Sequence, residues 1–506
     1  MKRYNITGYG IALFLLMFLS SCNEFLETPP SKRNGVEITT VEHLDAVFSN
    51  FSSFYAELCL HPYGSDDYDF PASLYLLAPT KFPMVAIQFG LWNTVDLPNL
   101  SNTVWSAEYS KIFSANMVLD FIDKVSGDAV MKDDLRAEAH FIRAYSMWTL
   151  ANMHCLPYSE TNKNEMGLSI KSSTSFEQPL DRATLKETYD MIERDIMEAL
   201  KLNVSLTASG SQRAWRASRE AIQAFAARFY LHMGNYQESL KYTKLALSGY
   251  DELVDYNSEI TYKPEYTNVG TQRITVNMPS TSSIMMPTKV VTAWKEFYYC
   301  RILLSNNWLV PSSSLMQTYD QDHDLRFKYH FVKNYSVKFV KTNPLENIYP
   351  GYVFFSATLG LPFGLTTSEM ILTKAECEAR LSDKWQEAME TLKPLRKKRM
   401  DAKAPGFVNL TAASQADAIK KVLEERRREL AFTHRWYDMR RLNNNNDAND
   451  DVEEVSKVFY PYNSLVVLKD EPVVTYKLPK NSRRYAIPLP FTDIDASQGV
   501  LKQNTY

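Results

Sequence analysis

The sequence predicts a mainly α fold in which helix pairs stack into a superhelix, interrupted by a loop-rich segment that contains a small β-hairpin. Two observations support this prediction. Apolar residues recur at helical spacing through residues 101–249 and 367–442, but this periodicity fails over 61–100 and 250–366. In addition, 506 residues are more than one core usually covers, which favours two lobes or a repeat architecture.

Composition agrees with a folded body and excludes one class of partner. Apolar residues make up 45% of the chain, which is ample for a packed core. The net charge is −3, and it falls to near −5 if the first 21 residues are removed, because they carry Lys2 and Arg3 and no acid. A nucleic-acid-binding surface needs a basic excess, so we expect no nucleic-acid partner.

The first 21 residues are predicted to be a secretory signal peptide. Lys2 and Arg3 precede an apolar run, 11–19, that is too short to span a bilayer. Leu19-Ser20-Ser21-Cys22 then resembles a bacterial lipoprotein box, in which Cys22 is acylated and becomes the first mature residue. The alternative is an ordinary cleaved signal followed by an incidental cysteine.

Residues 22–40 are predicted to be a lipidated N-terminus and a flexible tether. Pro29, Pro30 and the polar residues up to Thr40 are typical of an extended segment. Helical spacing begins near Val41 and continues through Phe48.

Four helices are predicted in the first half of the chain, over 105–124, 134–153, 181–202 and 218–233. The last one leads into Met233-Gly234-Asn235-Tyr236, with small residues such as Ala227 before the turn and Ala246 after it. Small residues where helices cross, with a glycine in the turn, resemble one tetratricopeptide unit. A weaker echo follows over 369–395, so the predicted repeats are degenerate.

The segment 250–366 is predicted to be rich in loops and to contain the β-hairpin. Phe327, Tyr329 and Phe331 alternate with polar residues, and Tyr335, Val337 and Phe339 do the same. This strand period predicts a hairpin that turns at 333–334.

The chain is predicted to close with one long helix, from Ala416 to about Leu442. Its Glu425-Arg426-Arg427-Arg428-Glu429 run invites a catalytic or phosphate-binding interpretation. Charges at this spacing on one helix also form local ion pairs, so we expect a structural network that holds the C-terminal segment.

No catalytic or metal-binding motif emerges from the sequence. The acidic residues Asp320, Asp322 and Asp324 resemble the start of a calcium loop, but Leu325 stands where glycine is needed and Phe331 where glutamate is needed. We therefore expect no metal at this motif and no cofactor, and an isolated calcium elsewhere in the chain stays open. The four cysteines after Cys22 are Cys59, Cys155, Cys300 and Cys377; they are widely scattered, which favours buried thiols over disulfides.

Several motifs point to one family when they are taken together. They are the lipoprotein box, the runs at 138–145 and 230–236, the Glu-Arg-Arg-Arg-Glu-Leu-Ala-Phe run with His-Arg-Trp at 425–436, and Ile-Pro-Leu-Pro at 487–490. With these motifs, nearly the whole chain from Cys22 resembles the SusD/RagB family of nutrient-binding outer-membrane lipoproteins, which implies a binding protein and not an enzyme. The resemblance implies one domain over 41–506, with tetratricopeptide-like units and a loop-rich ligand face. It also implies an outer-membrane, outward-facing location, a SusC-like TonB-dependent transporter as partner, and an oligosaccharide or a peptide as ligand.

The ligand face is predicted from sugar chemistry. A sugar offers a flat C–H face and a rim of hydroxyls, so its site needs aromatic rings and polar side chains. The loop-rich segments 61–100 and 250–366 supply both, and our candidate ligand-binding residues are Asp67, Tyr68, Trp92, Asn93, Trp294, Tyr298 and Tyr299. A helical glycoside hydrolase or lyase is the less favoured alternative, and a peptide-binding scaffold is another.

Overall fold

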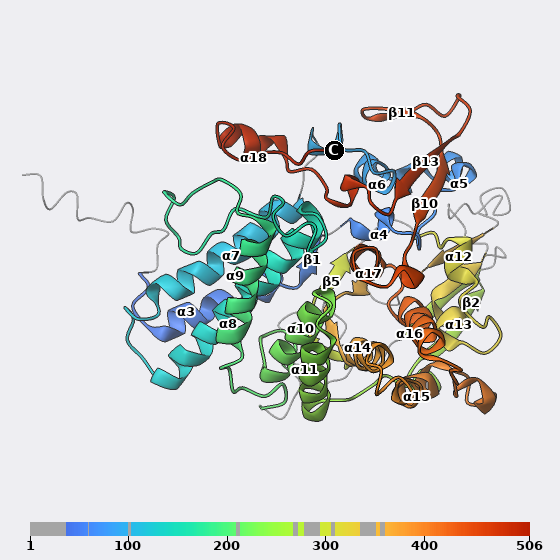
Figure 1. Ribbon diagram of the computed structural model, residues 1–506, viewed down its shortest axis with the longest axis horizontal. Helices are drawn as coiled ribbons and strands as arrows, with labels where there is room; N and C mark the ends of the chain where they lie inside the picture. Colours follow the sequence, from blue (N-terminus) through green and yellow to red (C-terminus); the bar gives the residue numbers. More distant parts are fainter. Residues whose placement is uncertain are drawn as a thin grey trace, which may run out of the picture.

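Helices form most of the protein, as the sequence predicts. The computed structural model describes residues 37–58, 60–99, 103–208, 213–266, 272–277, 294–304, 309–333, 351–354 and 360–506 (Figure 1). The predicted signal peptide and Cys22 lie outside the described residues, as do Cys59 and the predicted strand 335–339. None of the described helices combines the length and the apolar character needed to cross a membrane.

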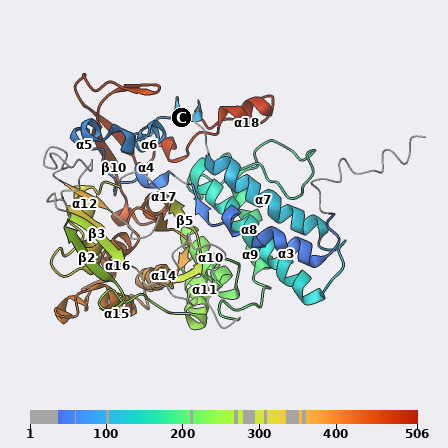
Figure 2. The ribbon, with the colours of Figure 1, turned by 180° about the vertical axis from the view of Figure 1, so that it is seen from behind.

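The helices pack mainly against their neighbours in sequence. One group joins α7 to α8 and α8 to α9, and a second joins α10 to α11, α11 to α14, and α14 to α15 and α16. The two groups lie side by side in both views (Figures 1 and 2). That these pairs form a tetratricopeptide-like superhelix stays a prediction. The longer helices are α3 (Val41–Ser49), α7 (Thr103–Phe121), α8 (Ala129–His154), α9 (Leu185–Ala199), α10 (Arg219–His232), α11 (Tyr236–Gly249), α14 (Thr367–Arg380), α15 (Glu387–Arg399), α16 (Gln415–Glu429) and α17 (Arg435–Leu442).

The join between α10 and α11 shows how local sequence sets the helix ends. The Ser218 hydroxyl caps α10 by accepting a hydrogen bond from Ala221 N, and the Asn235 side chain caps α11 by accepting one from Glu238 N. Gly234 ends the turn with φ of +72°, a left-handed conformation that glycine adopts without a Cβ penalty.

The predicted helix over 416–442 is in fact two helices, so this prediction was wrong in its middle. Helix α16 ends at Glu429 and α17 begins at Arg435, with Phe432 between them at φ of +64°. The break is stabilised from a distance, because Phe432 N donates to Asp67 Oδ2 at 3.0 Å. A contact between residues so far apart in sequence leaves no trace in local periodicity.

Short helices form in both segments where helical periodicity fails. Among the described residues, 61–100 contains three of them and 250–366 contains two. They are α4 (His61–Gly64), α5 (Ala72–Leu77), α6 (Met84–Gly90), α12 (Ser313–Met316) and α13 (Leu325–His330), and α18 (Phe491–Ala496) lies near the C-terminus.

The strands are short and form small sheets. A three-stranded sheet has the order β1–β5–β8, with β1 parallel to β5 and β5 antiparallel to β8, and the other pairs are antiparallel. The strands are β1 (Ala56–Glu57), β2 (Thr261–Tyr266), β3 (Gln272–Asn277), β4 (Phe297–Tyr299), β5 (Ile302–Leu304), β6 (Phe331–Lys333), β7 (Tyr352–Phe354), β8 (Gly360–Pro362), β9 (Leu365–Thr366), β10 (Glu454–Phe459), β11 (Tyr462–Asn463), β12 (Val466–Val467) and β13 (Val474–Pro479). Their pairs are β2–β3, β4–β9, β6–β7, β10–β13 and β11–β12.

The strand predicted through Phe327 and Tyr329 was wrong. These residues belong to α13, which Asp324 caps by accepting from Arg326 N, and only residues 331–333 form a strand, β6. Phe327 and Phe331 stack at 4.8 Å, a contact that the i, i+4 spacing of a helix turn provides. The alternating aromatic residues therefore belong to two neighbouring elements, α13 and β6. Within the same segment, β2 and β3 form an antiparallel pair instead.

Two contacts fix segments that are distant in sequence. Near the end of the predicted tether, Ser126 N donates to Thr39 O at 3.0 Å, so the chain joins the body before α3 begins. Deeper inside, the fully buried Arg228 of α10 and Glu369 of α14 form an ion pair of 2.6 Å. Buried charges persist only when paired, so this contact fixes how α10 meets α14.

The described cysteines, Cys155, Cys300 and Cys377, are buried free thiols, as predicted.

Candidate functional site

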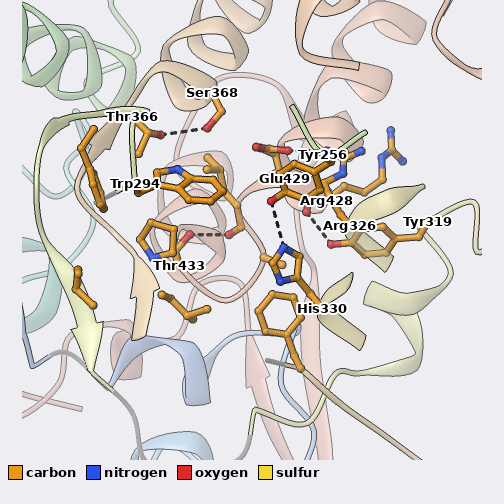
Figure 3. Close-up of a pocket in the computed structure, with 17 residues that line it drawn as sticks. Tyr256, Trp294, Tyr319, Arg326, His330, Thr366, Ser368, Arg428, Glu429 and Thr433 are labelled. Atoms are coloured by element: carbon orange, nitrogen blue, oxygen red, sulfur yellow. Dashed lines mark hydrogen bonds and ion pairs between the residues drawn. The ribbon is translucent and has the colours of Figure 1, made fainter. Parts of the chain in front are cut away.

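The candidate site is an aromatic cavity that combines the loop-rich segment with the C-terminal helices. It measures about 70 Å³, and Figure 3 shows the side chains around it. Its lining residues are Tyr256, Trp294, Phe297, Ile302, Tyr319, Arg326, His330, Phe354, Leu361, Pro362, Thr366, Ser368, Arg428, Glu429, Leu430, Ala431 and Thr433. We refer to it as the aromatic cavity.

Its aromatic wall is held in place by packing and hydrogen bonds. The rings of Tyr256 and Trp294 meet edge to face at 6.4 Å, and the Tyr256 hydroxyl lies 3.1 Å from His330 Nε2. The Tyr319 hydroxyl donates to the backbone carbonyl of Arg428 at 2.6 Å. Burial raises the pKa of both tyrosines above 10, so their hydroxyls are protonated at neutral pH.

Polar groups lie beside this wall. In Figure 3 the indole of Trp294 lies between the Thr366–Ser368 pair and Thr433. The hydroxyls of Thr366 and Ser368 are 3.2 Å apart, and that of Thr433 donates to the Leu430 carbonyl. Trp294 is 8% exposed, so most of its surface is buried in the cavity wall. The cavity thus pairs aromatic surface with hydroxyls.

The charged residues of the cavity neutralise one another. Arg326 bonds Glu429 at 2.9 Å and Arg428 bonds Glu425 at 2.7 Å, while Arg399, behind the cavity, also bonds Glu429. Burial by itself would raise the pKa of Glu429, but the guanidinium groups of Arg399 and Arg326 outweigh burial and hold that pKa below its usual value. Among the described lining residues, Arg326, Arg428 and Glu429 are therefore all paired and offer no free charge to an ionic ligand.

The Glu425–Glu429 run therefore forms a structural network, as predicted, but not the local one expected. Only Arg428–Glu425 joins residues one helix turn apart. The other pairs reach distant segments, such as Arg326 to Glu425 and Arg427 to Asp67. The network anchors the end of α16, where Arg428 and Glu429 line the cavity, to distant segments of the chain.

Among the seven predicted ligand residues, only Trp294 lines the aromatic cavity. Asp67 and Tyr68 follow α4, where both are buried. Asp67 accepts from Arg427 Nε at 2.7 Å, and the Tyr68 ring packs edge-on against Tyr63 at 4.9 Å. Burial raises the pKa of Asp67, an effect that the neighbouring Arg427 opposes.

Trp92 and Asn93 lie together after α6, away from the aromatic cavity. Trp92 is buried, has φ of +57°, and donates from its indole to Gly64 O at 3.0 Å. The Asn93 side chain is half-buried and accepts from Val95 N at 2.9 Å, closing a local turn.

Tyr298 and Tyr299 belong to β4 and pack into the core. The Tyr298 hydroxyl donates to Tyr250 O at 2.5 Å, and the Tyr299 ring meets Phe141 at 4.8 Å. For the six residues outside the cavity, contact with a ligand stays a prediction, and the observed contacts give each of them a packing role.

Sequence reasoning missed Tyr256, Tyr319 and His330. All three fall in the predicted loop-rich segment, but composition alone cannot distinguish a ring that lines a cavity from one that fills the core. Among the described residues, no group of three His, Cys, Asp or Glu side chains is placed to hold a metal ion.

Comparison with known proteins identifies the family. A family model described as starch-binding and associating with the outer membrane matches residues 86–231, and the SusD family model matches residues 367–506. Together they span more than half of the chain. The chain belongs to the SusD family. Membership supports carbohydrate binding in association with the outer membrane, and binding as the role rather than catalysis.

Solved structures share the fold of this SusD family member. A SusD superfamily protein from Bacteroides thetaiotaomicron is 16% identical, with a TM-score of 0.58 over 92% of this chain and 100% of that one. Surface glycan-binding protein A from Bacteroides uniformis is 12% identical, with a TM-score of 0.60 over 92% and 99%. A SusD-like carbohydrate binding protein from Bacteroides vulgatus is 15% identical, with a TM-score of 0.56 over 91% and 97%. No curated protein sequence matches the chain.

Proposed function

We propose that this SusD family member is a lipid-anchored cell-surface protein that captures a neutral oligosaccharide in the aromatic cavity and delivers it to a SusC-like TonB-dependent transporter. The observation that carries the proposal is the Trp294 ring, which lines a cavity of aromatic rings, hydroxyls and balanced charges. This is the chemistry that a sugar's flat face and hydroxyl rim require.

The size of the cavity defines how a glycan uses it. At about 70 Å³ it is smaller than the roughly 300–1,000 Å³ of typical small-molecule pockets, and it holds roughly the volume of two water molecules. It therefore accepts one substituent or edge of a sugar ring, and the rest of the chain lies outside it.

A glycoside hydrolase is less well supported by the same residues. Such enzymes need two opposed carboxylates. Glu429 is the one carboxylate that lines the described cavity, and it is engaged by Arg326 and Arg399. Peptide binding remains the alternative within the family, and a peptide belongs in the ligand panel that tests the proposal.

Replacing Trp294 tests the site. Trp294→Ala should weaken binding of a neutral oligosaccharide by about tenfold, the loss of roughly one aromatic contact with the part of the sugar that enters the cavity. Trp385→Ala is the matched control, because Trp385 is a half-buried tryptophan outside the cavity. The measurement is calorimetric titration with neutral hexasaccharides. Equal affinity of wild type and Trp294→Ala for a bound ligand would refute the site.

Replacing Cys22 tests the anchor separately. Cys22→Ala should release a protein that still binds glycan but no longer supports its uptake, because lipidation with several chains is what holds such a protein at a membrane. Cell fractionation measures release, and co-purification with a barrel protein after mild detergent extraction measures the transporter partnership. A Cys22→Ala protein that stays in the membrane fraction would contradict the lipoprotein assignment.

A further inference from the structure

A second concave surface lies apart from the aromatic cavity and has a different character. It is a groove of about 920 Å³ that shares no lining residue with the aromatic cavity. Five stretches of chain converge on it: the loop 156–162, the α10–α11 turn, the start of α16, the asparagine-rich loop 443–447, and residues 480–485. We call it the asparagine groove.

We propose that the asparagine groove is a second binding site, specific for a neutral polyhydroxylated ligand, of which an oligosaccharide is the natural class. The proposal stands independently of the aromatic cavity, although both surfaces would take ligands of one chemical class.

The walls of the groove are held by hydrogen bonds between the converging segments. Asn162 Nδ2 donates to Asn444 Oδ1 at 3.3 Å, joining the first loop to the asparagine-rich loop. Asn443 Nδ2 donates to the Tyr485 hydroxyl at 3.2 Å, joining that loop to the C-terminal stretch. Gln415 Nε2 donates to Arg380 O at 3.0 Å, which fixes the start of α16. A groove built in this way is organised before a ligand arrives, which lowers the cost of binding.

The charges in the groove are already paired. Arg380 bonds Asp450 at 2.6 Å, Arg441 bonds Glu376 at 2.6 Å, and Arg483 bonds Glu165 at 2.9 Å. The remaining charged lining residues are also paired, namely Lys480 with Asp451 and Glu453, Glu160 with Lys163, and Asp447 with Arg380. An acidic peptide or a phosphate would need an uncompensated cation here, and the described lining offers none.

What the groove does offer is a set of neutral hydrogen-bonding groups without partners among the described residues. They are the Tyr158 and Tyr236 hydroxyls, the Thr161 hydroxyl, and the side chains of Asn446 and Asn481. The Tyr158 ring packs on Tyr189 at 4.5 Å, so its hydroxyl is presented by a rigid ring.

A buried histidine adds one more neutral group. His232 is 8% exposed, lines the groove, and has no hydrogen-bond partner for Nε2 among the described residues. Burial holds the pKa of His232 well below 6.5, so the ring is uncharged at neutral pH. Amides, phenols, a hydroxyl and a neutral imidazole are the partners that sugar hydroxyls bond.

The test uses a triple variant in the full-length protein. Tyr158→Phe, Asn446→Ala and Asn481→Ala remove three partnerless groups without breaking any hydrogen bond described in the fold. The matched control is Asn164→Ala, because Asn164 is exposed, lies near the same loop and does not line the groove. Both are made in wild type and in Trp294→Ala, so that the two sites are measured separately.

The measurement is calorimetric titration with neutral hexasaccharides of glucose, mannose, galactose, xylose and arabinose, and with an anionic heparin hexasaccharide. In the Trp294→Ala background the triple variant should lose at least tenfold in affinity for a neutral glycan, and Asn164→Ala should not. Unchanged affinity of the triple variant, absence of binding to every neutral glycan, or tighter groove-dependent binding of heparin would each overturn the proposal. A triple-variant loss without any Trp294→Ala loss would support the groove and refute the aromatic cavity.

Discussion

Asp67 is the predicted ligand residue whose structural role is easiest to measure. Its carboxylate is fully buried, accepts from Arg427 Nε at 2.7 Å, and accepts from Phe432 N at 3.0 Å. Asp67→Ala removes both contacts. It leaves Arg427, which is 13% exposed, with the Asp66 carboxylate at 3.3 Å, the Asp66 carbonyl and the Ser314 hydroxyl as partners, and it removes the side-chain acceptor of Phe432 N.

The expected cost follows from these contacts. Breaking a buried ion pair costs about 3–5 kcal/mol, and orphaning a buried N–H costs about 1–3 kcal/mol. Because Arg427 keeps other partners, we take the low end of both and expect a loss of about 4 kcal/mol. An unfolding entropy of about 2.1 cal/mol/K per residue gives roughly 1 kcal/mol/K for a body of this size, so Tm should fall by about 4 °C.

Two further variants separate the contributions in a calorimetric melt. Asp67→Asn keeps an oxygen for Phe432 N and loses the charge, so its Tm should fall about half as far. Asp69→Ala is the control. Among the described residues the Asp69 carboxylate accepts only from Phe70 N, so the cost should stay under about 1 kcal/mol. If Asp67→Ala melts within 1 °C of wild type, the carboxylate is not a structural cross-link and a ligand role would be favoured again.

Three more outcomes follow from particular contacts. Burial lowers the pKa of Lys457 to about 7. Between pH 7 and 10.5 the unfolded chain therefore binds a proton that the folded chain has lost, so the free energy of unfolding rises with pH. In chemical unfolding from pH 7.5 to 9.5, wild type should gain about 2 kcal/mol more than Lys457→Met, and parallel pH curves would contradict this. Gly364→Ala should lower the free energy of unfolding by about 3 kcal/mol, because the new Cβ would lie 2.0 Å from Tyr299 O. Gly234→Ala should lower it by only about 1 kcal/mol, because its Cβ meets no atom within 4 Å and only the positive φ is unfavourable. Equal melting temperatures of the two variants would contradict this difference. Glycan affinity should change less than twofold between 50 and 500 mM NaCl, and a tenfold fall would show that an unpaired charge binds the ligand.

The helices were the most predictable part of the fold. Their amphipathic spacing and their caps are local, so α8 and α10 lie within a few residues of their predicted positions. The Ser218 cap and Gly234 illustrate why, since each acts on backbone groups a few residues away.

The failures have a common physical cause, which is that distant contacts decide them. The break between α16 and α17 is stabilised by Asp67, and α13 replaces a strand where Arg326 reaches Glu425 and Glu429. No local pattern contains either contact. The same limit explains the ligand candidates, because an aromatic residue such as Tyr299, within the segment predicted to be rich in loops, has the same composition signal whether it faces a ligand or Phe141.

The ion pairs that sequence cannot foresee also shape what the protein can bind. In the aromatic cavity Arg326 pairs with Glu429 and Arg428 pairs with Glu425, and in the asparagine groove Arg441 pairs with Glu376. These three carboxylates are buried, so moving one of the cations to a ligand would leave its former partner buried and unpaired, which costs more than a surface contact returns. The buried pairs of both surfaces are thereby held within the fold, and rings, hydroxyls and amides are the groups left for a ligand. The network that anchors the C-terminal helices thus also selects neutral, polyhydroxylated ligands over ionic ones.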